Sequence, residues 1–302
     1  MNIDRLINIL ITITLIEMMV SIGLGVTFVD LVAVIRNWRL VARAVLANYV
    51  CVPAATVGLV LLFNPQPMVA VGFLILAVCP GAPYGPPFAA IAKGNVAVAI
   101  GLMVLLAGSS AILAPLLLHY LIPFVSADEP LTVDATRIVS TLLVTQLLPL
   151  CLGVAVRQMR PLLADRLQRP ANLLSKLLNL AAVGFILVAQ FHLLTEIRLR
   201  AFIGMLALLI ASWAAGCLLG GRKPDARRAM TLTTSLRNVG VGLVIATGSF
   251  AGTPAVTATL VYGLFEVVGS LLLALWWARR SPVTEPWRTS LVTSKPGQEA
   301  RR

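Results

Sequence analysis

The chain has 302 residues, of which 59% are hydrophobic and only 12% are charged, and its formal net charge is +12 at pH 7. A mean hydropathy of +0.93 and repeated apolar runs of nearly membrane-spanning length exclude an ordinary soluble domain. The runs are continuous rather than alternating, which excludes a membrane β-barrel, and the basic residues gather in short loops and the C-terminal tail, which argues against nucleic-acid binding.

We therefore predict an all-α polytopic membrane protein with nine transmembrane helices, and its expected partner is the lipid bilayer. In chain order the helices are expected at residues 4–27, 39–63, 67–92, 95–121, 136–156, 171–193, 201–220, 227–250 and 254–278. Residues 1–278 are expected to form a single transmembrane domain. Residues 279–302, which contain three prolines and scattered charges, are expected to form a basic, disordered cytoplasmic tail.

The distribution of lysine and arginine between the loops predicts the orientation of the helices. Nineteen of the 24 basic residues fall in the loops of one side and in the tail, whereas the opposite side has only Arg5, Arg137, Arg198 and Arg200. This asymmetry alternates correctly through all nine spans. Because cytoplasmic loops carry the excess of positive charge, we expect the N-terminus outside the cell (inner) membrane and the C-terminus in the cytoplasm.

The third and eighth spans are predicted to be interrupted. The third contains CPGAPYGPP (79–87), and no continuous helix is compatible with this composition because each proline removes a backbone donor and clashes with the preceding turn. The eighth contains RNVGVG (237–242), in which a charged residue and two glycines break the apolar run. Interrupted helices at membrane depth occur only where the freed backbone is buried in protein or lines a cavity.

The positions of the two interruptions predict a pair of inverted repeats, at about residues 1–121 and 136–278. If the first group of four spans has lost a leading helix, each interrupted span is the fourth element of a five-helix repeat, and the two run in opposite directions. Such a pair is the best sequence indication of a transporter's substrate site. The alternative interpretation is two kinked helices with no shared role.

Both interrupted segments resemble the bile acid:sodium symporter family. AVCPGAPYGPPFAAIAKGNVAVAI (77–100) is similar to the family segment that begins CCPGG, and AMTLTTSLRNVGVGLVIA (229–246) is similar to the segment T-x-E-x-G-x-Q-N-x-G-L-A. Other family segments follow in the expected order over nearly the whole chain. The resemblance implies two inverted five-helix repeats whose interrupted helices cross at the centre, here in a nine-helix version that lacks the first helix.

The resemblance also implies two sodium sites at the crossing, but this chain lacks most of their side-chain ligands. Hard cations require oxygen ligands. The positions that correspond to sodium ligands are occupied by Gly85, Pro86, Ala99, Met103, Thr233 and Asn48. Thr233 replaces a glutamate shared by both sites, whereas Asn48 replaces a glutamine and keeps an amide. We therefore expect weak or absent sodium coupling and no other cofactor.

The remaining ligand glutamine of the family falls on Arg237, and Glu266 takes a position that is usually asparagine. A charge inside a membrane span is costly and marks a functional site. We hypothesise that the Arg237 guanidinium, a permanent cation with five N–H donors, lies where a sodium ion would be bound. It would pair with Glu266 and with carbonyls freed around residues 233–236. The alternative is that Arg237 snorkels to an interface or packs structurally.

The predicted function is secondary active transport of a small organic anion by alternating access, with no enzymatic activity. Half-helix N-termini after residues 87 and 238 would direct positive dipole ends at a substrate carboxylate or sulfonate. The predicted substrate-binding residues are Asn238, Arg237, Glu266, Pro86, Tyr84 and Asn48. Two alternatives are a sodium-coupled symporter with rearranged ligands and a membrane enzyme or sensor on the same scaffold. Glu17, inside the first span, either lines the cavity or makes a structural hydrogen bond, and no pattern specifies an oligomeric state.

Overall fold

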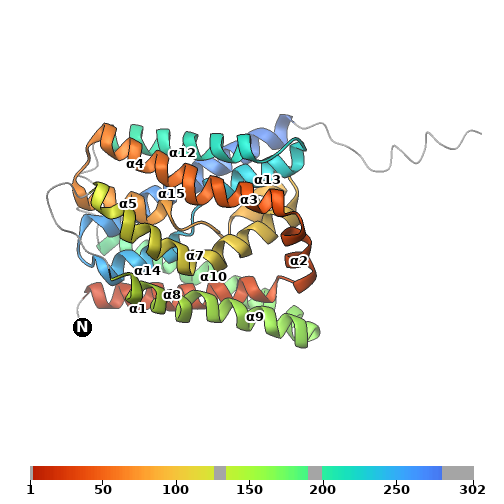
Figure 1. Ribbon diagram of the computed structural model, residues 1–302. Coiled ribbons are helices and arrows are strands. Elements are labelled where there is room, and N and C mark those ends of the chain that lie inside the picture. Colours follow the sequence, from red (N-terminus) through yellow and green to blue (C-terminus); the bar gives the residue numbers. More distant parts are fainter. Residues whose placement is uncertain (1–2, 126–133, 190–198, 281–302) are drawn as a thin grey trace, which may run out of the picture.

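The computed structural model describes residues 3–125, 134–189 and 199–280, and these form helices without a strand (Figure 1). All but the first two residues of the predicted tail lie outside these ranges. The helices, with two π-helical turns named η, are α1 (Ile3–Leu24), α2 (Phe28–Arg36), α3 (Trp38–Leu46), η1 (Ala47–Cys51), α4 (Val52–Phe63), α5 (Pro67–Ala77), α6 (Gly85–Ile91), α7 (Val96–Val125), α8 (Ala135–Leu142), η2 (Leu143–Leu147), α9 (Leu148–Met159), α10 (Pro161–Ala189), α12 (Leu199–Leu219), α13 (Pro224–Ser235), α14 (Val239–Ser249) and α15 (Pro254–Arg280).

Six helical segments of the described chain are long and apolar enough to cross a membrane. They are Arg5–Leu24, Trp38–Phe63, Val96–Val125, Ala135–Met159, Arg200–Leu219 and Pro254–Arg280. The third and eighth predicted spans are each split into two shorter helices, α5 with α6 and α13 with α14. The prediction of an all-α polytopic membrane protein is therefore confirmed. The sixth predicted span overlaps α10, which carries charged residues and is not one of the six membrane-spanning segments. The number of nine transmembrane helices therefore stays a prediction.

Two stretches differ from the sequence-based boundaries. Residues 28–36, expected in a loop, form the short helix α2, which packs so closely on α7 that a Cβ added to Gly101 would lie 2.2 Å from Val34 Cγ2. The helix α10 begins at Pro161 rather than near residue 171 and continues through Pro170. Proline is well suited to a first helical position, because its fixed φ is already helical and the missing N–H has no partner there in any case.

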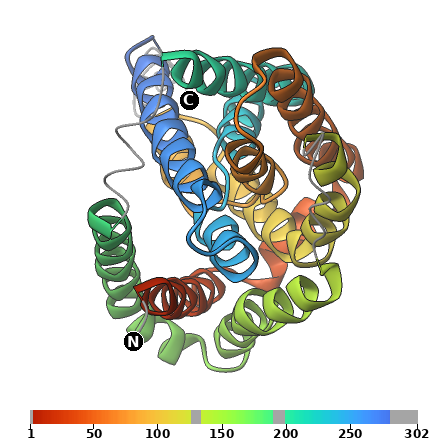
Figure 2. The same cartoon turned by 90° about the vertical axis from the view of Figure 1, so that its left-hand side faces the viewer.

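The helices run roughly side by side and form two groups (Figures 1 and 2). The smaller group contains α1, α8, α9 and α10, and α1 packs on both α9 and α10. The larger group contains the remaining helices, among which α5 packs on α15 and α12 packs on α13. The two groups are joined by α1 on α14, near the second interrupted helix, and by α8 and η2 on α7.

Glycines allow helix backbones to touch within each group, as small residues commonly do in membrane bundles. In the smaller group, a Cβ on Gly23 would lie 2.8 Å from Gly153 Cα, and a Cβ on Gly153 would lie 2.9 Å from Gly23 Cα. In the larger group, Gly72 of α5 lies against the backbone of α15. Between the groups, by contrast, the nearest atom to a Cβ on Gly240 of α14 is the terminal methyl of Met18, at 3.2 Å.

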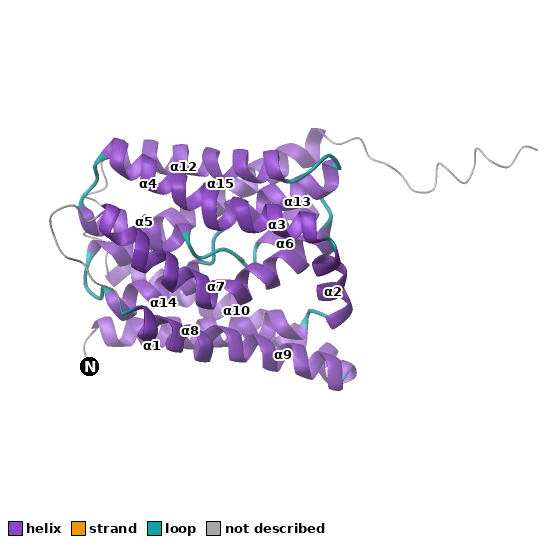
Figure 3. Ribbon diagram, in the orientation of Figure 1, coloured by secondary structure: helices purple, strands orange, loops and turns teal. Residues whose placement is uncertain are grey.

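Both interrupted helices break in the interior of the bundle, where their loop segments lie close together (Figure 3). The first break covers residues 78–84 and the second residues 236–238. Gly81 is required in the first break for two reasons. Its φ of +91° suits glycine, and an added Cβ would lie 2.4 Å from the backbone nitrogen of Ala107 on α7. The first break is therefore wedged against α7.

Candidate functional site at the helix crossing

The two breaks cross in direct backbone contact. Pro80 and Arg237 form an isolated antiparallel β-bridge, and the backbone N–H of Asn238 donates to the Cys79 carbonyl at 2.7 Å. The side-chain amide of Asn238 also donates to the Gly81 carbonyl at 3.4 Å. The two interrupted helices therefore cross, as the family resemblance implies.

Asn238 begins the second half of its broken helix. Its side-chain oxygen accepts from the Val241 N–H at 3.2 Å and so caps the N-terminus of α14. The side chain is completely buried, and its amide spans both breaks. The predicted substrate-binding residue therefore holds the crossing together in this conformation.

The guanidinium of Arg237 is buried at the crossing, with the residue only 1% exposed. Its partners come from three elements: Nη1 donates to Asn48 Oδ1 at 2.7 Å and to the Thr234 carbonyl at 3.3 Å, and Nη2 donates to the Asn48 carbonyl at 3.1 Å and to the Ala77 carbonyl. Nε donates to the Leu76 carbonyl at 3.3 Å. Four of the five acceptors are backbone carbonyl oxygens. The alternative of snorkelling to an interface is therefore wrong.

These carbonyls are available because regular helical bonding fails around them. Ala77 and Thr234 lie in the last turns of α5 and α13, where carbonyls have no partner within the helix. Asn48 lies in the π-helical turn η1, in which the Val52 N–H bonds to the Ala47 carbonyl five residues earlier. In the same pattern Asn48 would pair with residue 53, but that residue is proline and has no N–H.

The expected salt bridge between Arg237 and Glu266 is not formed. Among the described residues the one ion pair is Arg157–Asp165. The Glu266 carboxylate instead accepts from the backbone N–H of Arg237, with Oε1 at 2.5 Å. The reason is geometric: the Arg237 side chain extends towards α5 and η1, while α15 approaches only its backbone. Glu266 is completely buried, and its Oε2 has no hydrogen-bond partner in the described part of the chain.

The other positions that correspond to sodium ligands supply little oxygen to the crossing. Thr233 is buried, and its hydroxyl donates back to the Ala229 carbonyl of its own helix at 2.9 Å. Its methyl group faces Gly85, where an added Cβ would lie 3.0 Å away. Pro86 and Met103 are buried and have no side-chain oxygen.

Three further predicted positions lie around the crossing. Ala99 is buried in an apolar cluster between α6, α7 and α13. Tyr84 is 36% exposed at the start of α6, with its ring centroid 6.5 Å from that of Phe88. Asn48 is completely buried and also donates to Thr234 Oγ1 at 3.3 Å. Of the six predicted substrate-binding residues, Tyr84 alone is exposed.

Glu17 belongs to a different part of the protein. It is half-buried on α1 and accepts a hydrogen bond from Ser175 of α10. Ser21 donates to Asn172 on the same helix pair at 2.9 Å. The contact agrees with the structural alternative for Glu17, since it joins two helices of the smaller group.

Sequence reasoning missed the carbonyls of Leu76 and Ala77, which bind the guanidinium from the first break. It placed the accepting carbonyls only around residues 233–236, where the Thr234 carbonyl is indeed one of the five acceptors. A usable signal was present, because a helix that must end before CPG leaves its last carbonyls without regular helical partners.

Two discontinuous helices that cross inside an apolar helical bundle define a class of membrane protein, the secondary transporters, whose sites are formed by broken helices. The comparison with known families agrees. The model of the sodium bile acid symporter family matches residues 12–197, which is more than half of the chain. The chain belongs to this family, and it is a membrane transporter rather than an enzyme.

Three curated relatives are similar over most of the chain. An uncharacterized sodium-dependent transporter of Bacillus subtilis, YocS, is 24% identical over 277 residues, which are 89% of this chain and 83% of that protein. The probable sodium/metabolite cotransporter BASS2 of Oryza sativa is 23% identical, with 87% of this chain and 62% of the relative covered. The corresponding BASS1 of Arabidopsis thaliana is 25% identical, with coverage of 87% and 65%. The chain thus spans slightly less than two thirds of the chloroplast proteins.

Proposed function

We propose that this protein is a secondary transporter that moves a small organic anion by alternating access and is not coupled to sodium. The observation that supports the proposal is the buried guanidinium of Arg237, which is bonded to four carbonyls and one amide oxygen at the helix crossing. Carbonyls freed at helix breaks are the groups that coordinate coupling ions in transporters of this kind. Here the guanidinium of Arg237, a cation that belongs to the chain itself, binds these carbonyls.

A tethered cation cannot act as a coupling ion. Sodium coupling requires that the ion bind on one side of the membrane and leave on the other, whereas a side chain stays with the protein. Arg237 also repels a second cation from the same carbonyls, because guanidinium keeps its charge at any working pH. The Thr233 hydroxyl bonds within its own helix, and both oxygens of Asn48 already accept hydrogen bonds from Arg237.

The positive end of a helix dipole at the crossing supports an anionic substrate. The N-terminus of α14 begins at Val239, which is half-buried together with Gly240. The positive end of a helix dipole favours a nearby anion. The exposed Tyr84 could provide a hydroxyl at the edge of the same region. These groups suit a compact carboxylate or sulfonate.

The second candidate is a sodium-coupled symporter with rearranged ligands. The family description and the names of the three relatives favour it, since each refers to sodium. It would require sodium ligands other than the positions considered above. The two candidates therefore differ in one measurable property, the specific response to sodium.

We expect the thermal unfolding midpoint of the purified transporter to be the same in sodium and potassium chloride at equal ionic strength. No oxygen cage is left at the crossing to select the smaller ion. A titration of each salt up to the high millimolar range, followed by intrinsic fluorescence, measures the midpoint. Saturable stabilisation by millimolar sodium, but not by potassium, would show that the second candidate is right. Uptake of labelled anions into proteoliposomes with and without a sodium gradient would then identify the substrate.

We also propose that the protein lies in the inner membrane with its N-terminus outside and its C-terminus in the cytoplasm. The proposal is supported by the excess of basic residues in the loops of one side. A single cysteine at position 64 should react with a membrane-impermeant maleimide in intact cells, whereas one at position 222 should react only after permeabilisation. The reverse pattern would overturn the orientation.

A further inference from the structure

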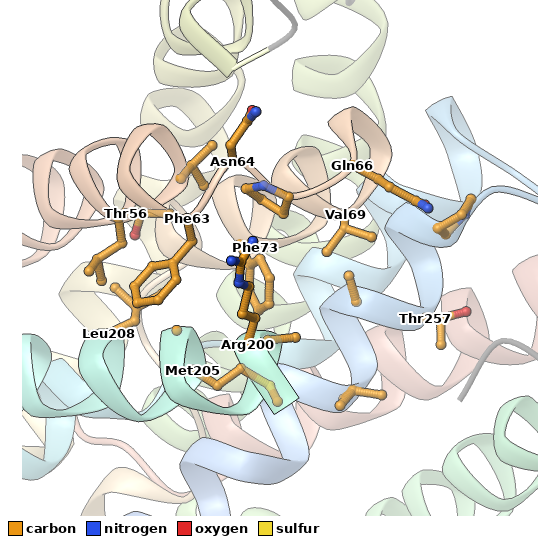
Figure 4. Close-up of a pocket in the computed structure, with 18 residues that line it drawn as sticks. Thr56, Phe63, Asn64, Gln66, Val69, Phe73, Arg200, Met205, Leu208 and Thr257 are labelled. Carbon is orange, nitrogen blue, oxygen red and sulfur yellow. The ribbon is translucent and has the colours of Figure 1, made fainter. Parts of the chain in front are cut away.

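A pocket separate from the helix crossing lies between α4, α5, α12 and α15, and it is drawn in Figure 4. Its volume is about 290 Å³. It is located at the end of the bundle where α4 is connected to α5, and neither Arg237, Asn238 nor Glu266 lines it. Between the pocket and Glu266 lies Tyr262, whose ring packs edge-on against Phe73 of the pocket wall with 5.5 Å between centroids.

The walls of the pocket are apolar. They include the side chains of Leu59, Phe63, Val69, Phe73, Met205 and Leu208. Gly204 of α12 leaves space facing α4, because the nearest atom to an added Cβ would be Phe63 Cδ2 at 3.8 Å. From Arg200 to Leu208 the pocket follows α12 over eight residue-to-residue steps, or roughly 12 Å at 1.5 Å per step. These dimensions suit part of one hydrocarbon chain.

The mouth of the pocket is polar and positive. Arg200 extends from the start of α12 into the pocket (Figure 4), and no ion pair or hydrogen bond to another described residue engages its guanidinium. Asn64 and Gln66 add two amides. The N-termini of α5, α12 and α15 lie at the same end, since Gln66 and Pro254 also line the pocket. The Arg200 guanidinium, with the positive ends of the helix dipoles beside it, favours an anion at this mouth.

The pocket is flanked by surfaces that face lipid. On α4, Leu61 is 64% and Leu62 is 75% exposed. On α12, Phe202, Ile203 and Leu206 are between 44% and 49% exposed. Exposed apolar side chains on membrane-spanning helices are covered by hydrocarbon chains in the bilayer. A ligand can therefore reach the pocket laterally from the membrane, with its anionic group at the level of the helix ends.

From these observations we propose that the pocket between α4, α5, α12 and α15 binds an anionic membrane phospholipid. The head-group phosphate bonds to Arg200 at the mouth, and one acyl chain enters the apolar space beside Gly204. The site is independent of the transport site at the crossing.

Native mass spectrometry of the purified full-length protein, titrated with phosphatidylglycerol or with phosphatidylcholine, tests the proposal. We expect phosphatidylglycerol to bind about tenfold more tightly, because it keeps its net negative charge for the arginine. Arg200→Gln should remove this preference, and Gly204→Phe should weaken binding of both lipids by filling the pocket. The matched control is Arg222→Gln, an exposed arginine just beyond the other end of α12, which should keep the preference.

Two results would overturn the proposal. One is an equal loss of preference in Arg200→Gln and Arg222→Gln, which would mean that the lipid responds only to overall charge. The other is complete displacement of phosphatidylglycerol by millimolar hexanoate, which would assign the pocket to soluble anions. Arg200 is exposed, so its variant decides the question even if Gly204→Phe does not fold.

Discussion

Replacing Arg237 by methionine is expected to destabilise the transporter more than any other single substitution at the crossing. The change removes every donor that the guanidinium provides to Leu76, Ala77, Asn48 and Thr234. Each orphaned buried acceptor costs about 1–3 kcal/mol, although such losses are not additive. Although the two groups form no direct ion pair, the loss also leaves the buried Glu266 carboxylate without a nearby positive charge, and an uncompensated buried charge typically costs about 3–5 kcal/mol. We expect a total effect of at least that size.

The measurement is the thermal unfolding midpoint in detergent, compared with Arg237→Lys and Arg237→Gln. Lysine keeps the charge but has one compact ammonium group, which cannot reach acceptors on three elements at once. We therefore expect an intermediate midpoint. Glutamine restores the family residue, yet it should not create sodium binding, because Gly85 and Pro86 still lack side-chain ligands. A midpoint for Arg237→Met equal to that of the parent would show that the guanidinium does not hold the crossing together.

Glu266→Gln is expected to have the second largest effect, about 1–3 kcal/mol, because the charged carboxylate accepts a buried hydrogen bond but forms no direct ion pair with the guanidinium. The glutamine carbonyl can still accept from the Arg237 N–H, so the substitution isolates the loss of charge from the loss of the hydrogen bond. Without the carboxylate, the buried guanidinium keeps its five hydrogen bonds but loses the negative charge beside its backbone. Glu17→Gln is the matched control, since Glu17 is also an intramembrane carboxylate but bonds to Ser175 in the other helix group. It should lower the midpoint much less.

A double-mutant cycle separates pairing from packing. Arg237→Met and Glu266→Leu are measured singly and together, and the double variant removes both charges so that neither is left alone in the interior. We expect the double variant to be more stable than the sum of the two single effects predicts. Additive effects would mean that the two groups do not interact. Loss of pH-driven uptake with intact exchange in Glu266→Gln would indicate a proton carrier rather than a permanent partner.

The sequence predicted the two breaks and the family resemblance implied their crossing, but neither predicted the direction of the side chains. Four prolines within residues 79–87 and the glycines after Arg237 exclude continuous helices, so the breaks follow from local backbone chemistry. Whether Arg237 would meet Glu266 depended on the packing of α15 against the second break. No local rule supplies that geometry, and the expected salt bridge was wrong.

The acceptors of the guanidinium show a second limit of sequence reasoning. Backbone carbonyls have no residue type, so Leu76 and Ala77 look like ordinary apolar residues in the sequence. Asn48 is different, because Pro53 follows it by the five residues that a π-helical turn spans. A π-turn itself was not predictable from that proline alone, since proline at a first helical position is ordinary. The short helix α2 was missed for a related reason: its partner surface is Gly101, far along the chain.

The reciprocal contact between Gly23 and Gly153 has a mechanical consequence. Because the two backbones are in direct contact, no flexible side chain lies between them. We therefore expect α1 and α9 to move together as one rigid body. The opposite face of α1 meets Gly240 through the thioether of Met18, a flexible side chain that can change rotamer and follow a shifting neighbour. The rigid contact with α9 and the adaptable contact with α14 therefore lie on the same helix, α1. The contact of α1 with α14, beside Asn238, is therefore one of the surfaces at which the two groups can shift, together with the contact of α8 and η2 with α7.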